Sequence, residues 1–420
     1  MTERSSLLTR QIAWRLALPC IFFMFMSSLD RANISFAAAA IQQDLGLSKT
    51  DYGFAAGVLF VGFLAGQYPS LFLLQRIGFP RWIAALTLFW GLSTALVGLA
   101  QTGTQLGLLR VMIGLAEGGL APGITLYLGQ FATSRERAST FATPMLAVPL
   151  SVVLGGPISG LLLDMTPPFA IANWRWMLMA EGGATMLIGL CALFWFPATP
   201  ADARWIAPDD RVVLAEKATT RSVTHQANDW RILAHPAVWM ASLLWFCLLC
   251  GSYGIMFWLP QTVQQMAGLS GFETGLVNAL PWIGAFGAIY LNARHSDQTG
   301  ERFWHVAAPA MLAAGAIAAA GLAGPGVAAL VLLFIAGIGL GGAQGAFWAI
   351  PTTVFTPTTM AVGVVAVNIL GSAGGLVMPP LIGLVKDATP NPMAPTLMVS
   401  AALVAGGLLA LAIRRTSTAR

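Results

Sequence analysis

Charged residues are scarce in this chain of 420 residues. Asp, Glu, Lys and Arg make up 9% of the sequence, whereas about 25% is usual for soluble domains. Hydrophobic residues make up 57%, and the mean hydropathy is +0.74. This composition excludes an ordinary soluble domain and predicts a chain that lies largely within a lipid bilayer.

Cysteine and histidine are also scarce, and neither is spaced for metal binding. All four cysteines (Cys20, Cys191, Cys247 and Cys250) lie in apolar stretches, and no histidine completes a ligand set with the last two. The glycine-rich run 337–345 lacks the Lys-Ser/Thr pair of a phosphate-binding loop. Since no nucleophile, base and metal set converges, we expect no structural disulfide, no metal, no cofactor and no enzymatic activity.

Apolar stretches of about twenty residues, each able to cross a ~30 Å hydrocarbon core, recur along the whole chain. We predict an all-α membrane protein of twelve transmembrane helices in two six-helix bundles. The first bundle covers residues 1–200, a cytoplasmic linker covers 201–235 and the second bundle covers 236–420. The predicted spans are 14–41, 53–74, 82–101, 105–130, 139–164, 175–197, 236–261, 274–293, 304–323, 327–350, 359–384 and 394–413.

The net charge of +5 is explained by topology rather than by nucleic-acid binding. Seventeen Lys and Arg residues lie on the side of the predicted termini and three lie on the other side. By the positive-inside rule, this predicts that both termini are cytoplasmic in the cell's inner (plasma) membrane. The alternative is a cleaved signal peptide ending near alanines 37–40, which would remove the first span.

Asp30 and Arg31 lie in the middle of the first predicted span, and Arg110 and Glu117 lie seven residues apart in the fourth. A charge at the bilayer centre costs roughly 2.5–3.5 kcal/mol on insertion scales, so each needs a partner or a function. Arg110 and Glu117, seven residues apart, lie on the same face of their helix. Asp30 and Arg31 are adjacent, so their side chains point about 100° apart and cannot pair with each other. We therefore expect two acid–base contacts between these spans. The sequence leaves open whether Asp30 meets Arg110 or Arg31 meets Glu117.

These residue types suit anion transport coupled to protons. Arginine binds a carboxylate through two parallel donors and keeps its charge, so Arg31 and Arg110 are the predicted substrate-binding residues. Burial raises the pKa of a carboxyl group and a nearby arginine lowers it. Asp30 and Glu117 are therefore the predicted proton-coupling residues. The alternative is that the four charges only neutralise one another and join two helices.

Several motifs extend this interpretation to a family. The chain resembles the major facilitator superfamily, and within it the anion:cation symporter family of organic-acid transporters. This resemblance implies alternating access between two halves, proton coupling by an acid in each of the two spans, and substrate binding by arginine. One departure is Gln75, where the family's first loop signature has Asp. The matching segments are LDRANI (29–34), Arg110 with GG (118–119) and PG (122–123), RERA (135–138), WRW (174–176) with EG (181–182), ADARW (201–205), YG (253–254) with FWLPQ (257–261), and Asp297 with GER (300–302).

The same resemblance indicates further substrate-binding positions. Trp348, Asn368 and Tyr253 fall where the family has pocket residues, although Asn368 could instead bond between helices and Trp348 could only fill space. Phe63 and Val148 fall where a sugar-acid carrier would need hydrogen-bonding side chains. Because unpaired hydroxyl groups are costly, we expect an aromatic carboxylate rather than a sugar acid.

The leading prediction is a proton-coupled importer of a small organic carboxylate that works as a monomer in the bilayer. The segment GGPISG (155–160) resembles an antiporter motif and leaves an exporter or exchanger as an alternative. Small residues there could also serve close helix packing. A carboxylate sensor that does not transport is a third possibility, and it would be expected to carry an appended signalling domain.

Overall fold

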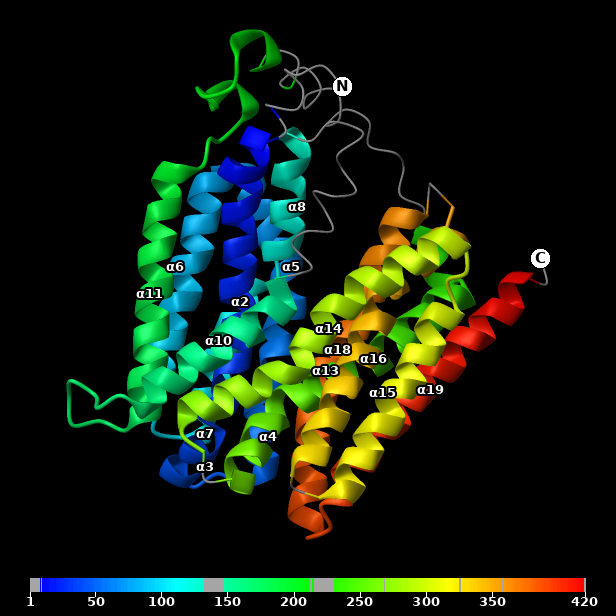
Figure 1. The fold of residues 1–420 in the computed structure, drawn as a ribbon. Helices are drawn as coiled ribbons and strands as arrows, with labels where there is room; N and C mark the ends of the chain where they lie inside the picture. Colours follow the sequence, from blue (N-terminus) through cyan, green and yellow to red (C-terminus); the bar gives the residue numbers. More distant parts are fainter. Residues whose placement is uncertain are drawn as a thin grey trace.

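The computed structural model describes residues 8, 10–131, 147–211, 214, 230–267, 269–324, 326–356 and 359–418. Within these ranges the chain forms helices and no strand. Twelve helical segments of the described chain are long and apolar enough to cross a membrane, as the sequence predicts. Figure 1 shows them in two halves, one made by the first six segments and one by the last six.

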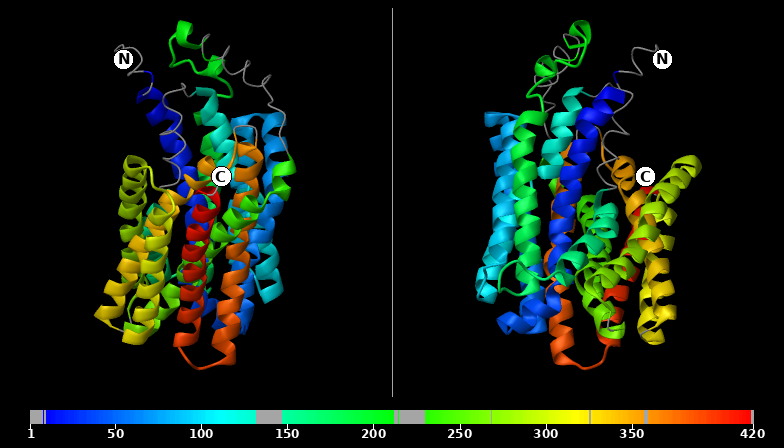
Figure 2. Two further views of the ribbon diagram at one scale, coloured as in Figure 1. Left: turned by 90° about the vertical axis from the view of Figure 1, so that its right-hand side faces the viewer. Right: turned by 60° about the vertical axis from the view of Figure 1, so that its left-hand side comes forward.

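The first half contains the segments that form the candidate site. In chain order its elements are the π-helical turn η1 (Ala13–Ala17), α2 (Leu18–Phe36), α3 (Ala38–Leu45), α4 (Lys49–Gly57), α5 (Leu59–Ile77), α6 (Phe79–Val97), α7 (Gly103–Glu117), α8 (Leu120–Phe131), α10 (Ala147–Asp164) and α11 (Asn173–Trp195). The segment after α11 projects beyond the helices at the end that carries the N-terminus (Figures 1 and 2). We call this the termini end, and the opposite end the far end.

The second half follows two short turns, η3 (Pro200–Asp202) and η4 (Trp230–Ala234). Its helices are α13 (Pro236–Ala267), α14 (Gly271–Thr299), α15 (Trp304–Ala323), α16 (Val327–Phe347), α17 (Ile350–Val354), α18 (Met360–Ala388) and α19 (Met393–Thr418). Ser48 begins α4 and Ser270 begins α14 with the same capping box, in which each serine bonds an acid three residues on.

Three of the predicted boundaries are not matched in full by the described structure. The predicted first span continues to residue 41, but the helix breaks at Ala37 and α3 follows as a separate element. The predicted start of the fifth span at residue 139 and the RERA motif lie outside the described residues. The linker 201–235 is described only in part, and the domain boundaries there stay a prediction.

The two halves pack closely at the far end through glycine. A Cβ atom on Gly160 of α10 would lie 2.0 Å from the backbone oxygen of Gly271 in α14. A Cβ atom on Gly53 of α4 would lie 2.4 Å from the backbone oxygen of Pro379 in α18. Because these distances are too short for any side chain, both helix pairs require glycine. Toward the termini end the halves diverge (Figure 1).

Two aspartates extend the same contacts at the helix ends. Asp164, the last residue of α10, accepts hydrogen bonds from the backbone N–H groups of Gly271 and Phe272, both at 2.8 Å. Asp387, near the end of α18, accepts from the backbone N–H of Thr50 at 2.8 Å and from its hydroxyl at 2.7 Å. Asp164 therefore joins the fifth span of the first half to the second span of the second half. Asp387 makes the reciprocal contact, from the fifth span of the second half to the second span of the first. A carboxylate there satisfies free N–H groups and complements the helix dipole.

We expect Gly160→Ala to open the far end, because its methyl group cannot fit against the backbone of α14. The readout is the distance between spin labels on Phe169→Cys and Pro390→Cys, which are exposed at the far end of the two halves, with exposed Cys191 replaced by serine. The distance should lengthen.

Gly183→Ala is the matched control, since a Cβ there meets nothing within 4 Å. Both substitutions make the same change in helix propensity. An unchanged distance in Gly160→Ala would show that the close contact is not needed to hold the far end shut.

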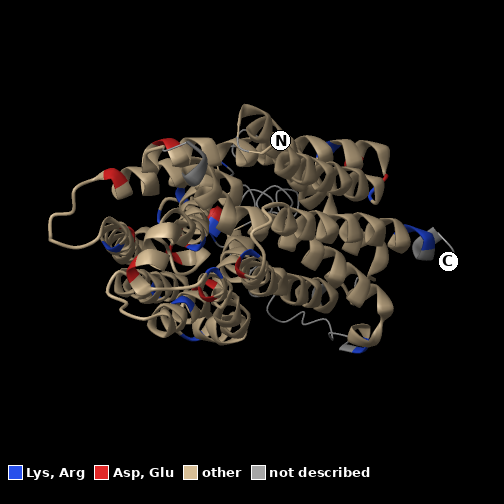
Figure 3. Cartoon of the chain, turned by 90° about the horizontal axis from the view of Figure 1, so that it is seen from below, with Lys and Arg blue, Asp and Glu red and all other residues tan. Residues whose placement is uncertain are grey.

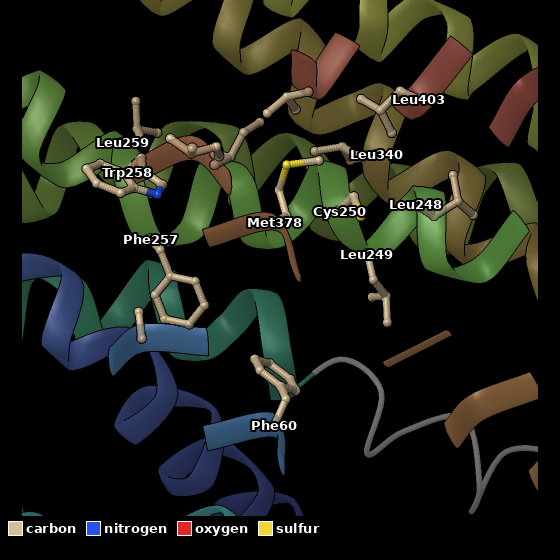
Figure 4. Close-up of a cluster of buried hydrophobic side chains, with 14 of the residues drawn as sticks. Phe60, Leu248, Leu249, Cys250, Phe257, Trp258, Leu259, Leu340, Met378 and Leu403 are labelled. Atoms are coloured by element: carbon tan, nitrogen blue, oxygen red, sulfur yellow. The ribbon is translucent and has the colours of Figure 1, made fainter. Parts of the chain in front are cut away.

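Aromatic side chains from both halves meet beside α2. The rings of Phe60 in α5 and Tyr253 in α13 are 4.6 Å apart, and those of Tyr52 in α4 and Trp258 in α13 are 5.5 Å apart. In Figure 4, Phe257 projects from α13 toward the helices of the first half, where Phe60 lies. These contacts fix α13 against the first half at the level of the buried charges described next.

Candidate functional site

Arg31 of α2 and Glu117 of α7 form a buried ion pair. The Arg31 Nε atom lies 3.0 Å from Oε2 of Glu117, and the two side chains are 13% and 0% exposed. Arg31 also donates to the hydroxyl of Ser27, one turn earlier, at 3.1 Å. Neither Glu117 oxygen receives a well-aligned hydrogen bond, so this carboxyl group depends mainly on the charge of Arg31.

Arg110 does not form an acid–base pair with the Asp30 carboxylate. It is 1% exposed and donates to the backbone oxygens of Asp30 at 3.3 Å and Arg31 at 3.4 Å, rather than to the Asp30 carboxylate. The expectation of two cross-helix acid–base contacts is therefore wrong for this pair. The Asp30 carboxylate is instead bonded by neutral donors.

Asp30 instead belongs to a hydrogen-bonded chain that ends at a third acid. Its Oδ2 accepts from the Thr94 hydroxyl of α6 at 2.7 Å, and its Oδ1 accepts from Nδ2 of Asn33 at 2.8 Å. The same Nδ2 donates to Oε2 of Glu181 in α11 at 2.9 Å. The hydroxyl of Ser159 in α10 donates to the other Glu181 oxygen at 2.7 Å. Asp30 is thus linked to Glu181 through a single amide group.

Helix spacing explains how one helix serves two sets of partners. Asp30 and Asn33 are three residues apart, and Ser27 and Arg31 are four apart, so each pair lies on one face of α2. The first face meets α6 and α11, and the second meets α7. Figure 3 shows how few charged residues lie along the helices, with most of them away from the half that carries the labelled C-terminus.

Two predicted aromatic residues lie beside Arg31. The ring centroid of Phe63 in α5 is 5.5 Å from the guanidinium carbon of Arg31. Tyr253 of α13 is half-buried and interacts with Arg31 from the second half. Arg31 therefore lies near aromatic rings of both halves, which attract its positive charge.

For the remaining predicted residues the structure gives burial and packing. Val148 is half-buried in α10, and Asn368 is half-buried in α18. Trp348 packs edge-on against Trp245 at 5.0 Å. Within the described residues, no recorded hydrogen bond, ion pair or ring contact joins these three to the charged group.

Sequence reasoning assigned no role to Glu181, Ser159 or Thr94. Glu181 was available by the criterion that selected the other charges, since it lies inside the predicted span 175–197. Ser159 and Thr94 carried no such signal, because neutral hydroxyl groups are common in apolar helices. Their importance follows from the carboxylates that they contact.

The comparisons with known proteins agree with this architecture. Residues 20–379 match the family model of the Major Facilitator Superfamily. The chain is 36% identical over 417 residues to a putative tartrate transporter of Agrobacterium vitis, covering 97% of this chain and 91% of that protein. It is 33% identical over 414 residues to the inner membrane transport protein RhmT of Escherichia coli K12, covering 97% of this chain and 94% of that protein.

A solved structure gives the same fold. A bacterial homolog to the human lysosomal transporter Spinster, in an inward-facing and occupied conformation, superimposes with a TM-score of 0.80 at 18% identity over 97% of both chains. The family match and the relatives together exclude an enzyme and indicate a multi-pass membrane transporter of small organic substrates. The chain belongs to the major facilitator superfamily.

Proposed function

We propose that this chain imports a small organic carboxylate together with protons by alternating access. The observation that carries the proposal is the Arg31–Glu117 ion pair, in which a partly exposed guanidinium is held by a fully buried carboxylate beside aromatic rings of both halves. All of these groups belong to one chain, so we propose that the monomer is the working unit.

The ion pair gives a mechanism for coupling. While Glu117 is ionised, it holds Arg31 and competes with an incoming anion. A proton on Glu117 removes that competition and leaves the guanidinium free to bind the substrate carboxylate through two donors. Release of substrate and proton on the other side restores the pair. Arg110 holds the α2 backbone at Asp30 and Arg31 and so keeps Arg31 in position. Asp30 is the second proposed proton carrier.

Orientation supports import. The distribution of Lys and Arg favours cytoplasmic termini in the inner membrane. The far end would then face outward, and the contacts of Gly160 and Asp387 would hold it shut in an inward-facing state. Entry of an anion opposes an inside-negative potential by ~2.3 kcal/mol per charge per 100 mV. Transport of more protons than the substrate has negative charges reverses that sign.

Two classes of carboxylate remain as candidates. Phe63 beside Arg31, and Tyr253 opposite it, favour an aromatic acid. The relative named as a putative tartrate transporter favours a hydroxylated dicarboxylate as the second candidate. An exporter or exchanger has less support, because Gly160 of the antiporter-like segment is used in packing against Gly271.

The test is uptake into proteoliposomes under an imposed pH gradient, with labelled aromatic acids, hydroxylated dicarboxylates and sugar acids offered separately. We expect an aromatic acid to accumulate when the side facing the termini is alkaline. Accumulation of the dicarboxylate alone would favour the second candidate. Exchange of substrate without accumulation would contradict symport.

A further inference from the structure

Glu181 is a buried acid that the coupling mechanism above does not use. Its side chain lies in α11, and the residue is 7% exposed. Its partners are the Asn33 amide at 2.9 Å and the Ser159 hydroxyl at 2.7 Å, both of which are neutral. A buried carboxylate without a positively charged partner is costly unless it carries a proton.

The charge balance of the cluster points the same way. Arg31 and Arg110 supply two positive charges, and arginine does not lose its proton in proteins. Asp30, Glu117 and Glu181 supply three negative charges when all are ionised. Among the described residues, these five are the charged groups of the buried site, so it carries one excess negative charge unless one acid is protonated.

The contacts distinguish the three acids. Glu117 has the guanidinium of Arg31 at 3.0 Å. Asp30 has donors on both oxygens and the field of Arg110. Glu181 faces the like charge of Asp30 and the neutral Asn33 amide from α2, and the neutral Ser159 from α10.

We infer that Glu181 holds a standing proton that is not transported and keeps the substrate-free site electrically neutral. This inference rests on the proposed function, since it concerns the charge of the same site. With Glu181 neutral, Asp30 and Glu117 ionised and both arginines charged, the empty site has no net charge. When a monoanion binds Arg31, one proton on Glu117 restores neutrality, and a second proton on Asp30 is the excess positive charge that favours entry. Glu181 therefore acts as a positioning residue that holds Asn33 and Asp30 in place.

The direct test is infrared absorption spectroscopy of the full-length protein in lipid, recorded for the unsubstituted protein and for each variant across a range of pH. We expect the carbonyl band of a protonated carboxylic acid throughout the pH range over which transport varies. The band should be lost in Glu181→Gln and shifted in Ser159→Ala, which removes one hydrogen bond but keeps the acid. Absence of the band, or its loss in Asp30→Asn or Glu117→Gln but not in Glu181→Gln, would overturn the inference.

The transport test counts protons per substrate from the pH gradient at which net flux stops. Glutamine has the charge of a protonated glutamate, so the count should be the same in Glu181→Gln and in the unsubstituted protein. A decrease by one proton would show that Glu181 carries a transported proton. If the unsubstituted protein itself shows no response to the gradient, the proposed function fails, whereas the infrared result judges Glu181 separately.

Discussion

Replacement of Glu117 by glutamine should abolish proton-driven accumulation while exchange of substrate continues. Glutamine cannot ionise, so Arg31 stays free to bind an anion at every pH and binding no longer requires a proton. One pH unit contributes ~1.4 kcal/mol per coupled proton, which corresponds to about tenfold accumulation. The accumulation ratio should therefore fall about tenfold, for a gradient of one pH unit, for each coupled proton that the substitution removes. The measurement is the steady-state ratio of labelled substrate in proteoliposomes, compared with counterflow in the same vesicles.

Asp30→Asn provides a second arm of the same experiment. It should also reduce accumulation, because Asp30 is the other proposed proton carrier. Asp202→Asn is the control, since this aspartate is exposed and bonds Thr199 in the turn after α11, outside the buried site, so proton-driven accumulation should not change. Retained accumulation in Glu117→Gln would show that this acid does not couple protons.

Loss of the folded protein would support the alternative, in which the ion pair is only structural. Removal of one member of a buried pair costs about 3–5 kcal/mol, because the other charge is left without a partner. A double variant, Arg31→Gln with Glu117→Gln, separates the cases. If the pair is structural, the double variant should recover the thermal stability lost in the single variant.

Replacement of Arg31 by glutamine should have the largest effect on substrate binding. Loss of one partner from a buried, hydrogen-bonded charge pair costs about 2–5 kcal/mol, or about 30-fold to several thousandfold in Kd. Arg31→Lys keeps the charge but loses the planar pair of donors, so it should fall between glutamine and arginine. The measurement is equilibrium binding of the carboxylate identified by uptake.

Arg302→Gln is the control, because Arg302 lies between α14 and α15 and pairs with Asp297, outside the buried site. Arg110→Gln gives the decisive comparison. The two arginines differ in exposure, and only Arg31 meets both the ion-pair partner and the aromatic rings. An unchanged Kd in Arg31→Gln, with a large loss of affinity in Arg110→Gln, would show that Arg110 rather than Arg31 binds the substrate carboxylate.

The sequence predicted the helices well because bilayer-spanning segments have a strong compositional signal. It also indicated Asp30, Arg31, Arg110 and Glu117, since charges in apolar stretches are conspicuous. It did not predict that Asp30 would bond Thr94, because helix periodicity gives the direction of a side chain but not the identity of its neighbour.

The glycines show a similar limit. The chain contains 45 glycine residues, and their number alone does not reveal which ones lie against another backbone. The small residues around Gly160 indicated close packing but not its partner, and the structure shows that Gly160 meets the backbone of α14 whereas Gly183 meets open space. That difference depends on the crossing of two helices from opposite halves, which no local pattern encodes.

The two aspartate caps at the far end have a consequence for sequence variation. Each closes the two halves with one carboxylate and the amide groups of a helix start, so the receiving side is largely peptide backbone. Substitutions among the first residues of α14 leave that receptor intact as long as the helix still starts there and Gly271 is kept, because a Cβ on Gly271 would lie 2.6 Å from the backbone oxygen of Gly160. Relatives could therefore vary the other side chains on the receiving side of each contact, provided that the close-packed glycines and a single acidic side chain persist.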